Sequence, residues 1–363
     1  MTRIIPVFLL LIAAKTAQAD WPVARGDAAM SGVGTANLPE QLEEIWSFKT
    51  GDSIEGSPAV VGDVVYVASM DKHLYALDAN TAALKWKRKL GTMKASPAVR
   101  NGRVFVGDLE GKVYAVNAAD GVLVWTFETM GEIHAGANFI GNDLLVGSHD
   151  STLYRLTPDG KKVWEFKLDG PVNGSAAVSG ERTFVAGCDS LLHCIDVTSG
   201  KSVGSIDLGG QAGATASVFG DGIYLGTMSN QVLGLNTKAF KKTWDFEAKR
   251  KQQPFYSSAA VTEKVIVLGG RDKRVYALDR LTGKEVWSHL TEGNVDASPT
   301  VVGNRVYVGS LSRTGEFYVL DLATGKEVQQ LIFDSAVSGS VGVGKDSLYV
   351  GTDKGSVYKL GKK

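Results

Sequence analysis

This chain has little proline and no excess of either charge. Its nine prolines are spread out and no low-complexity segment interrupts it, so nothing marks a linker between separate domains. The 39 lysines and arginines equal the 39 aspartates and glutamates, so no overall field attracts nucleic acid or an anionic membrane, and we expect no nucleic-acid partner. Glycine is abundant, with 43 residues, as is valine, a composition that predicts many short strands joined by tight turns.

Cysteine is also scarce. The only two, Cys188 and Cys194, lie in one predicted hairpin that turns near Asp189 and Ser190. That arrangement separates them by about three rungs of the ladder, roughly 10 Å, which is too far for a disulfide. We expect both to be unpaired packing residues.

The first nineteen residues have the layout of a secretory signal peptide. Arg3 precedes an apolar run from Ile4 to Ala14, and Ala17-Gln18-Ala19 forms a small-residue cleavage site before Asp20. The run is too short to span a bilayer, and no cysteine near the cleavage site could carry a lipid. We expect an exported, periplasmic or secreted monomer without a membrane span or lipid anchor; an uncleaved anchor is the alternative.

A repeat of about forty residues organises the rest of the chain. A small-residue motif followed by an apolar strand occurs eight times, at spacings of 39, 40, 39, 40, 43, 40 and 42 residues. The eight copies are GSPAV 56–60, ASPAV 95–99, AGANF 135–139, GSAAV 174–178, ATASV 214–218, SSAAV 257–261, ASPTV 297–301 and GSVGV 339–343. This period predicts an all-β, eight-bladed propeller over 43–363, preceded by an extended arm over 20–42.

Each unit contains four predicted strands. In the sixth unit, SSAAV is followed by VIVLGG, VYALD and KEVWSHL, with a turn before each. The turns at Asp279–Gly283 and Asp321–Gly325 suit a tight connection, because aspartate accepts bonds from amides ahead of it and glycine tolerates positive φ. Residues 44–48 form a fourth strand without a unit, while the eighth unit stops after three strands, so we expect the N-terminal strand to complete the last blade.

Tryptophans recur near the end of six units. We interpret them as large rings that fill the space between neighbouring blades. Units four and seven have Val203 and Val328 near that place, which predicts less apolar packing there. The six tryptophans are Trp46, Trp86, Trp125, Trp164, Trp244 and Trp287.

Two segments carry a family resemblance. The pattern ALD-xx-TGK-xx-W at 277–287 and the degenerate copy AVNAADGVLVW at 115–125 resemble the PQQ-type propeller repeat. That family contains quinoprotein alcohol dehydrogenases and a BamB-type scaffold that supports β-barrel assembly in the outer membrane. The resemblance covers 43–360 and implies the propeller architecture; it leaves the function open. The segment Trp21–Asp27 is similar to the start of mature quinoproteins, and we interpret it as an arm attached to the ring.

One position per unit varies in chemistry while its neighbours stay small or apolar. It lies two residues before the aligned small residue, where eight equivalent backbone positions point to one axial funnel. The candidate cofactor- or ligand-binding ring consists of Glu55, Lys94, His134, Asn173, Tyr256 and Asp296, with Gly213 and Ser338 at the two other places. The alternative is a solvated rim in which Glu55 and Asp296 pair with Lys94 or His134.

The resemblance implies PQQ with Ca²⁺ as a cofactor, but the residues do not support it independently. A hard cation needs oxygen ligands gathered at one point, whereas Glu55, Asn173 and Asp296 lie in units one, four and seven. The five histidines are scattered and show no zinc spacing, so we predict no metal. The recurring serines are small residues near the axis with no base beside them, so we predict no catalytic residue and no cofactor.

The longest connection between units is the basic loop Ala248–Tyr256. We select it as the segment that contacts a partner, and the leading hypothesis is a non-enzymatic scaffold for protein partners in the envelope. The alternatives are a PQQ-dependent dehydrogenase or a sensor of a small polar ligand, and a carbohydrate-binding module that would use Phe255 and Tyr256. The candidate partner-binding residues are Arg250, Lys251, Phe255, Tyr256 and Arg271.

Overall fold

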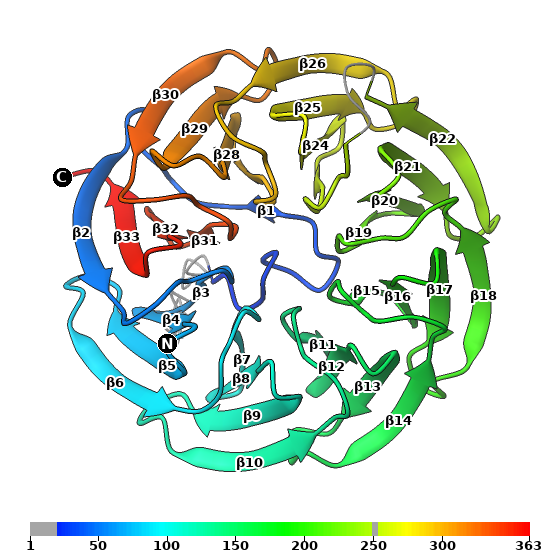
Figure 1. Ribbon diagram of the computed structural model, residues 1–363, viewed down its shortest axis with the longest axis horizontal. Coiled ribbons are helices and arrows are strands. Elements are labelled where there is room, and N and C mark those ends of the chain that lie inside the picture. Colours follow the sequence, from blue (N-terminus) through cyan, green and yellow to red (C-terminus); the bar gives the residue numbers. More distant parts are fainter. Residues whose placement is uncertain (1–19, 249–252) are drawn as a thin grey trace, which may run out of the picture.

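The structure, a computed structural model, describes residues 20–248 and 253–363. Thirty-three strands and no helices occur in these residues, and the strands form eight antiparallel sheets arranged as blades around one axis (Figure 1). The predicted all-β, eight-bladed propeller is confirmed. None of the described residues forms a helix that could cross a membrane.

The blades follow the predicted repeat. Blades one to four consist of β3 (Ala59–Val61), β4 (Val64–Ala68), β5 (His73–Asp78) and β6 (Leu84–Lys89); β7 (Ala98–Arg100), β8 (Arg103–Gly107), β9 (Lys112–Asn117) and β10 (Leu123–Glu128); β11 (Asn138–Ile140), β12 (Asp143–Ser148), β13 (Thr152–Leu156) and β14 (Lys162–Lys167); and β15 (Ala177–Ser179), β16 (Arg182–Ala186), β17 (Leu191–Asp196) and β18 (Ser202–Asp207). Blades five to eight consist of β19 (Ser217–Phe219), β20 (Gly222–Gly226), β21 (Gln231–Asn236) and β22 (Lys241–Glu247); β23 (Ala260–Val261), β24 (Val265–Gly270), β25 (Arg274–Asp279) and β26 (Glu285–Leu290); β27 (Thr300–Val302), β28 (Arg305–Gly309), β29 (Glu316–Asp321) and β30 (Glu327–Ile332); and β31 (Gly342–Val343), β32 (Leu348–Gly351), β33 (Ser356–Gly361) and the N-terminal β2 (Glu43–Lys49).

Position within a blade sets the residue pattern of each strand. The second and third strands lie between neighbouring blades, so β24 and β25 are buried on both faces and read as continuous apolar runs. The fourth strand forms the outer wall, and in β26 only the tryptophan is buried. A register shift between the third and fourth strands occurs beside the tryptophan position in every blade and bends the outer strand there.

The outer tryptophans connect neighbouring blades, as predicted. Trp86 donates from Nε1 to the carbonyl of Ala118 in the next blade at 2.9 Å, and Trp287 does the same to Leu322 at 2.9 Å. The equivalent bonds come from Trp46, Trp125, Trp164 and Trp244. Glycine stands at the turn below five of the six rings, and Gly325 shows why: its φ is +68°, and a Cβ on it would lie 2.5 Å from the Trp287 ring.

Blades four and seven have other residues at the tryptophan position and fill the space between blades differently. The residue there in blade four is Gly204, and the Phe240 ring of the next blade covers it, while Val203 is 43% exposed. The predicted loss of apolar packing is therefore offset by Phe240. In blade seven the residue is Gln329, whose side chain makes two 2.8 Å hydrogen bonds to the backbone of Leu42.

Strand β2 completes the last blade. It pairs antiparallel with β33, with Trp46 opposite Lys359 and Phe48 opposite Val357. The first and last parts of the chain thus share one sheet, beside each other in Figure 1. The closure expected from residues 44–48 is confirmed, and it covers the outer edge of β33, so blade eight has four strands like the others.

The N-terminal arm (residues 20–42) follows the axial edge of the blades instead of lying loosely on the ring. In six blades the innermost strand donates a backbone N–H to a carbonyl of the arm. The donors are Val60, Val99, Val178, Val218, Val261 and Val301, and the acceptors are Trp21, Pro22, Ala28, Ala29, Ser31 and Gly32 in the same order. Within the arm, β1 (Val33–Gly34) adds to blade seven parallel to β27.

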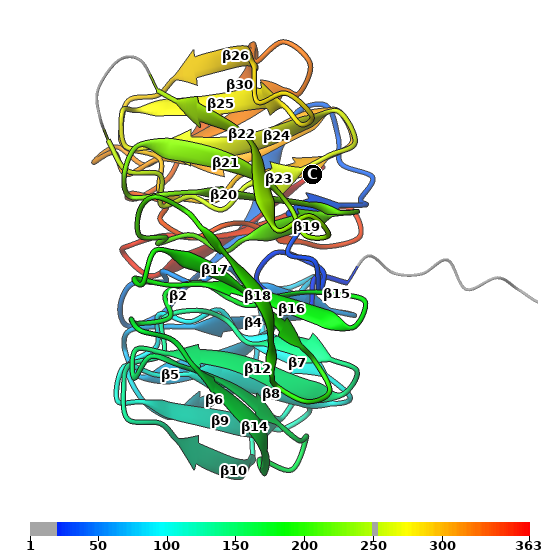
Figure 2. The same cartoon turned by 90° about the vertical axis from the view of Figure 1, so that its right-hand side faces the viewer.

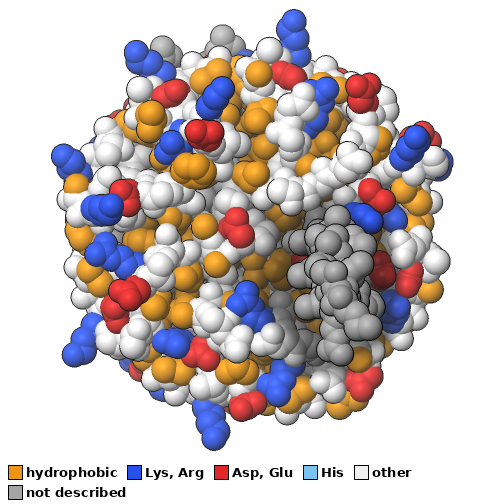
Figure 3. Space-filling view, turned by 180° about the vertical axis from the view of Figure 1, so that it is seen from behind, with side chains coloured by type: hydrophobic (Ala, Val, Ile, Leu, Met, Phe, Trp, Pro, Cys, Tyr) orange, Lys and Arg blue, Asp and Glu red, His pale blue; other side chains and the backbone are white. Residues whose placement is uncertain are grey.

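The arm closes one face of the disc. In the side view it lies on one side of the ring (Figure 2), and on that face charged side chains of both signs are interspersed, most of them toward the periphery (Figure 3). Because the arm satisfies inner-strand amides at this end, the axial space opens toward the opposite face, where the second strand of each blade turns into the third. We call this opposite end the mouth.

Both cysteines are unpaired, as expected from their positions. Cys194 is buried in β17, and Cys188 lies at the turn that precedes it. Cys188 Sγ accepts a hydrogen bond from Nδ2 of Asn173 at 3.0 Å.

Candidate functional site

A ring of small side chains lines the inner part of the axial cavity, whose volume is about 250 Å³. Their hydroxyl groups connect blades: Ser96 Oγ accepts the N–H of Ser57 at 2.8 Å, and Thr215 Oγ accepts that of Ser175 at 2.9 Å. Ser258 and Ser298 accept the N–H of the preceding blade in the same way. These hydroxyls satisfy buried amides, which accounts for their recurrence by packing and not by catalysis.

Arg25 of the arm forms the floor of this cavity. It is 3% exposed and donates to the carbonyls of Ser298 and Pro299 and to Oγ of Ser340. Burial lowers the pKa of Arg25 to about 10, so its guanidinium is charged at neutral pH. The cavity therefore has a fixed positive charge at its closed end.

The structure gathers the predicted ring at the mouth. Seven of the eight variable positions line an outer cavity of about 400 Å³, together with Met228 and Arg271 from the turns between second and third strands. The eighth, Ser338, lines the inner cavity. The seven are Glu55, Lys94, His134, Asn173, Gly213, Tyr256 and Asp296.

Most charged groups at the mouth have a partner within the chain. Lys94 Nζ lies 3.2 Å from Glu55 Oε2, across the junction of blades one and two. Arg271 holds Asp296 through Nε and Nη2, the latter at 2.6 Å from Oδ2, and its guanidinium lies 4.2 Å from the centroid of the Tyr256 ring. Of the pairings weighed from the sequence, Glu55 with Lys94 is present, whereas Asp296 pairs with Arg271.

The aspartates in the turns at the mouth accept hydrogen bonds from tyrosines of the strands that follow. Tyr75 donates to Asp71 at 2.6 Å, and Tyr154 donates to Asp150 at 2.7 Å. Tyr114 and Tyr276 make the same bond to Asp108 and Asp272. A hydrogen bond from a buried tyrosine orders the turn, so these carboxylates have a structural role in the turns of the mouth.

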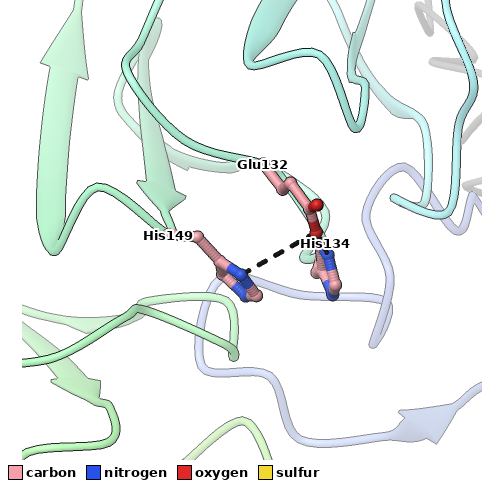
Figure 4. A group of neighbouring side chains, drawn as sticks. All are labelled: Glu132, His134 and His149. Carbon is pink, nitrogen blue, oxygen red and sulfur yellow. Dashed lines mark hydrogen bonds and ion pairs between the residues drawn. The ribbon is translucent and has the colours of Figure 1, made fainter.

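Blade three brings two histidines and a glutamate together (Figure 4). His134 Nε2 lies 2.6 Å from Glu132 Oε2, and the His134 and His149 ring centroids are 4.0 Å apart. Burial and then the nearby His134 lower the pKa of His149, while the hydrogen bond with His134 lowers the pKa of Glu132. Spacing along the chain hid this group, because His134 precedes β11 whereas His149 lies in the turn after β12. Both positions face the mouth. Because equivalent positions of one blade lie close together there, this shared location could have predicted the group from the sequence.

The mouth does not fit PQQ with Ca²⁺. The two ring carboxylates belong to blades one and seven, and each already pairs with a basic side chain. Over 20–248 and 253–363, the one group of three metal-ligating side chains contains two imidazoles, which do not suit a hard, oxygen-binding cation.

The predicted partner-binding residues divide into three sets. Arg250 and Lys251 lie outside the described residues. Phe255 as a contact residue is wrong: it is 1% exposed and packs against Tyr276, because its ring fills the core between blades five and six. This also removes the Phe255–Tyr256 platform suggested for carbohydrate. Tyr256 and Arg271 both line the mouth.

Comparison with known proteins places these features in a family. The family model described as "Outer membrane protein assembly factor BamB" matches residues 34–147 and 149–363. A curated relative, the outer membrane protein assembly factor BamB of Marinobacter adhaerens, is 32% identical over 16% of this chain and 20% of its own length, so the match spans about a fifth of that relative.

Two solved structures share the fold. BamB from Moraxella catarrhalis has a TM-score of 0.76 at 18% identity, covering 89% of this chain and 100% of that one. The quinohemoprotein alcohol dehydrogenase from Comamonas testosteroni has a TM-score of 0.80 at 13% identity, covering 95% and 81%. At these identities the likeness concerns the fold alone.

Proposed function

Because the chain belongs to the family of the outer membrane protein assembly factor BamB, we propose that it is an exported, non-enzymatic scaffold that binds other proteins of the cell envelope. The binding surface is the mouth. Residues 1–19, which carry the signal-peptide pattern, supply the export step, and the arm and ring 20–363 are the mature protein.

The observation that carries this proposal is the group formed by Tyr256, Arg271 and Asp296. Tyrosine and arginine dominate the binding energy of protein interfaces. Here the arginine is fixed by a two-pronged ion pair and lies on the tyrosine ring, with its side chain 37% exposed. A side chain that is already ordered loses little rotational freedom on binding, which favours affinity.

The pairing of charges at the mouth supports a binding role over catalysis. A general base needs a carboxylate that is free to take a proton. Glu55 and Asp296 are each held by a basic side chain, and Arg25 at the floor donates from Nη1 and Nη2 to blades seven and eight. These pairs present a patterned surface of both signs, which gives specificity toward a protein partner.

Crosslinking in the native envelope, followed by recovery of the partner, tests the scaffold. We expect Tyr256→Ala and Arg271→Ala each to cost about 2 kcal/mol or more of binding, roughly 30-fold in affinity, with the melting temperature of Tyr256→Ala unchanged. Leu281→Ala is the matched control, because Leu281 is 71% exposed in a turn on the arm face. Arg250→Glu tests the loop that lies outside the described residues. Equal recovery from all four variants would rule out the mouth as the binding surface.

A further inference from the structure

Glu132, His134 and His149 have the composition of a transition-metal site. One ligand atom from each lies within 4.8 Å of the others. Two imidazoles and one carboxylate suit Zn²⁺, Cu²⁺, Ni²⁺ or Fe²⁺, whereas Ca²⁺ and Mg²⁺ take oxygen ligands. The group is separate from the Tyr256–Arg271–Asp296 group, and its argument does not rest on the scaffold role.

The distances are close to those that a metal ion imposes. With bonds of about 2.0 to 2.2 Å, the ligand atoms around one Zn²⁺ lie roughly 3 to 3.5 Å from one another. Glu132 Oε2 now lies 2.6 Å from His134 Nε2 and 4.0 Å from His149 Nδ1. Side-chain rotations that lengthen the first distance and shorten the second bring Glu132 Oε2 into that range of both imidazole nitrogens, which themselves lie within 4.8 Å of each other.

The fold restrains both histidines while leaving the group accessible. The imidazole rings lie 31° from parallel with their centroids 4.0 Å apart, and the His149 side chain is only 24% exposed. His134 lines the outer cavity, and the Glu132 side chain is 52% exposed, so an ion can reach the group from solvent.

We propose that Glu132, His134 and His149 bind a divalent first-row transition-metal ion such as Zn²⁺ at the mouth of the propeller. Three protein ligands leave at least one coordination position for water or for a side chain of a bound molecule. The site belongs to blade three alone. The blade-one turn, by comparison, sets only one histidine, His73, against the carboxylate of Asp71.

Isothermal titration of the full chain, free of any histidine tag, with ZnCl₂ and separately with CaCl₂ tests the site. We expect one Zn²⁺ per chain and no Ca²⁺ at the same concentrations. Loss of a residue that only orients a metal ligand costs roughly 10- to 100-fold in metal affinity. His134→Ala, His149→Ala and Glu132→Gln each remove a ligand itself, so we expect each to weaken Zn²⁺ binding by more than that. Glu132→Gln changes an exposed group and keeps the test valid if a histidine variant folds poorly.

His73→Ala is the matched control, because the His73 and His149 side chains are 25% and 24% exposed. It is expected to leave Zn²⁺ affinity unchanged. Electron paramagnetic resonance of the Cu²⁺-loaded protein gives a second readout, with hyperfine coupling expected from two imidazole nitrogens and from one in His149→Ala. Absence of Zn²⁺ binding, equal binding by all variants, or a Cu²⁺ spectrum unchanged by His149→Ala would each overturn the proposal.

Discussion

The ring of Phe240 occupies the space above Gly204 that a tryptophan occupies at six other places. A Cβ added to Gly204 would lie 2.8 Å from Cε1 of Phe240. Phe240 stands where five other blades have the turn glycine and has a φ of +48°, a conformation that costs energy for a bulky residue. In five other blades the outer strand carries a tryptophan and the turn of the next blade carries a glycine. In blade four the strand carries the glycine and the next blade carries the large ring.

This exchange predicts strong coupling between the two positions. Gly204→Trp alone meets the phenylalanine ring, and Phe240→Gly alone leaves a gap, so each is expected to cost about 1–3 kcal/mol of unfolding free energy. The double variant restores the common arrangement and is expected to recover about 0.5–3 kcal/mol of the sum, measured by urea denaturation. Strictly additive effects would show that the two residues do not share one space.

Gly32 tests how tightly the arm is fitted into the ring. A Cβ there would lie 1.9 Å from Nη2 of Arg25, which is buried and cannot move aside. Gly303 has a similar φ, +60° against +66°, but nothing lies within 4 Å of an added Cβ. We expect Gly32→Ala to destabilise the protein by about 1–3 kcal/mol more than Gly303→Ala, because both carry the backbone strain and only one carries the clash. Equal losses would mean that Arg25 is not held in place.

Removal of β2 tests closure of the ring. Deleting residues 43–50 exposes the edge of β33 and removes the Trp46 bond to Ala79 between blades eight and one. We expect aggregation, because an unpaired strand edge pairs with other molecules. Size-exclusion chromatography and thermal melting measure this, and a soluble, cooperatively melting truncation would contradict it.

The turn aspartates predict a loss of stability in acid. Hydrogen bonds from Lys85 and then Thr81 lower the pKa of Asp78 from 3.8 to about 2. A lowered pKa in the folded state stabilises the protein above the unfolded pKa, and that contribution is lost as the pH falls from about 4 toward 2. We expect Asp78→Asn to melt a few degrees below the parent at pH 6, and the gap to narrow as the pH falls below 4 and to be largely lost by about pH 2. A gap independent of pH would show that the carboxylate charge is not responsible.

The repeat made most of the fold predictable from the sequence. A motif every forty residues forces equivalent residues into equivalent places, so blade number, closure by residues 44–48 and the inter-blade role of Trp86 or Trp287 follow from one aligned unit. The same symmetry gathers Glu55 and the other variable positions around one axis. It could not predict that Asp296 pairs with Arg271, because that depends on side-chain reach between neighbouring loops.

Features that occur only once in the chain could not be predicted from the repeat. Phe255 looks like part of an exposed loop, yet its ring is buried because the connection turns back into the core there. His149 joins His134 only through the pairing of strands within blade three. The arm has no repeat at all, so nothing in its sequence indicated that Trp21 through Gly32 would supply acceptors to six blades.

The bonds of the arm impose an order on assembly. Its acceptors are synthesised first, but the donors reach from Val60 to Val301, and β2 waits for β33 near the other end of the chain. Strand β2 therefore has no partner until β33 is made, and the ring cannot close until the final blade exists. Closure of the ring depends on the completed polypeptide, in which one of the first strands pairs with the last.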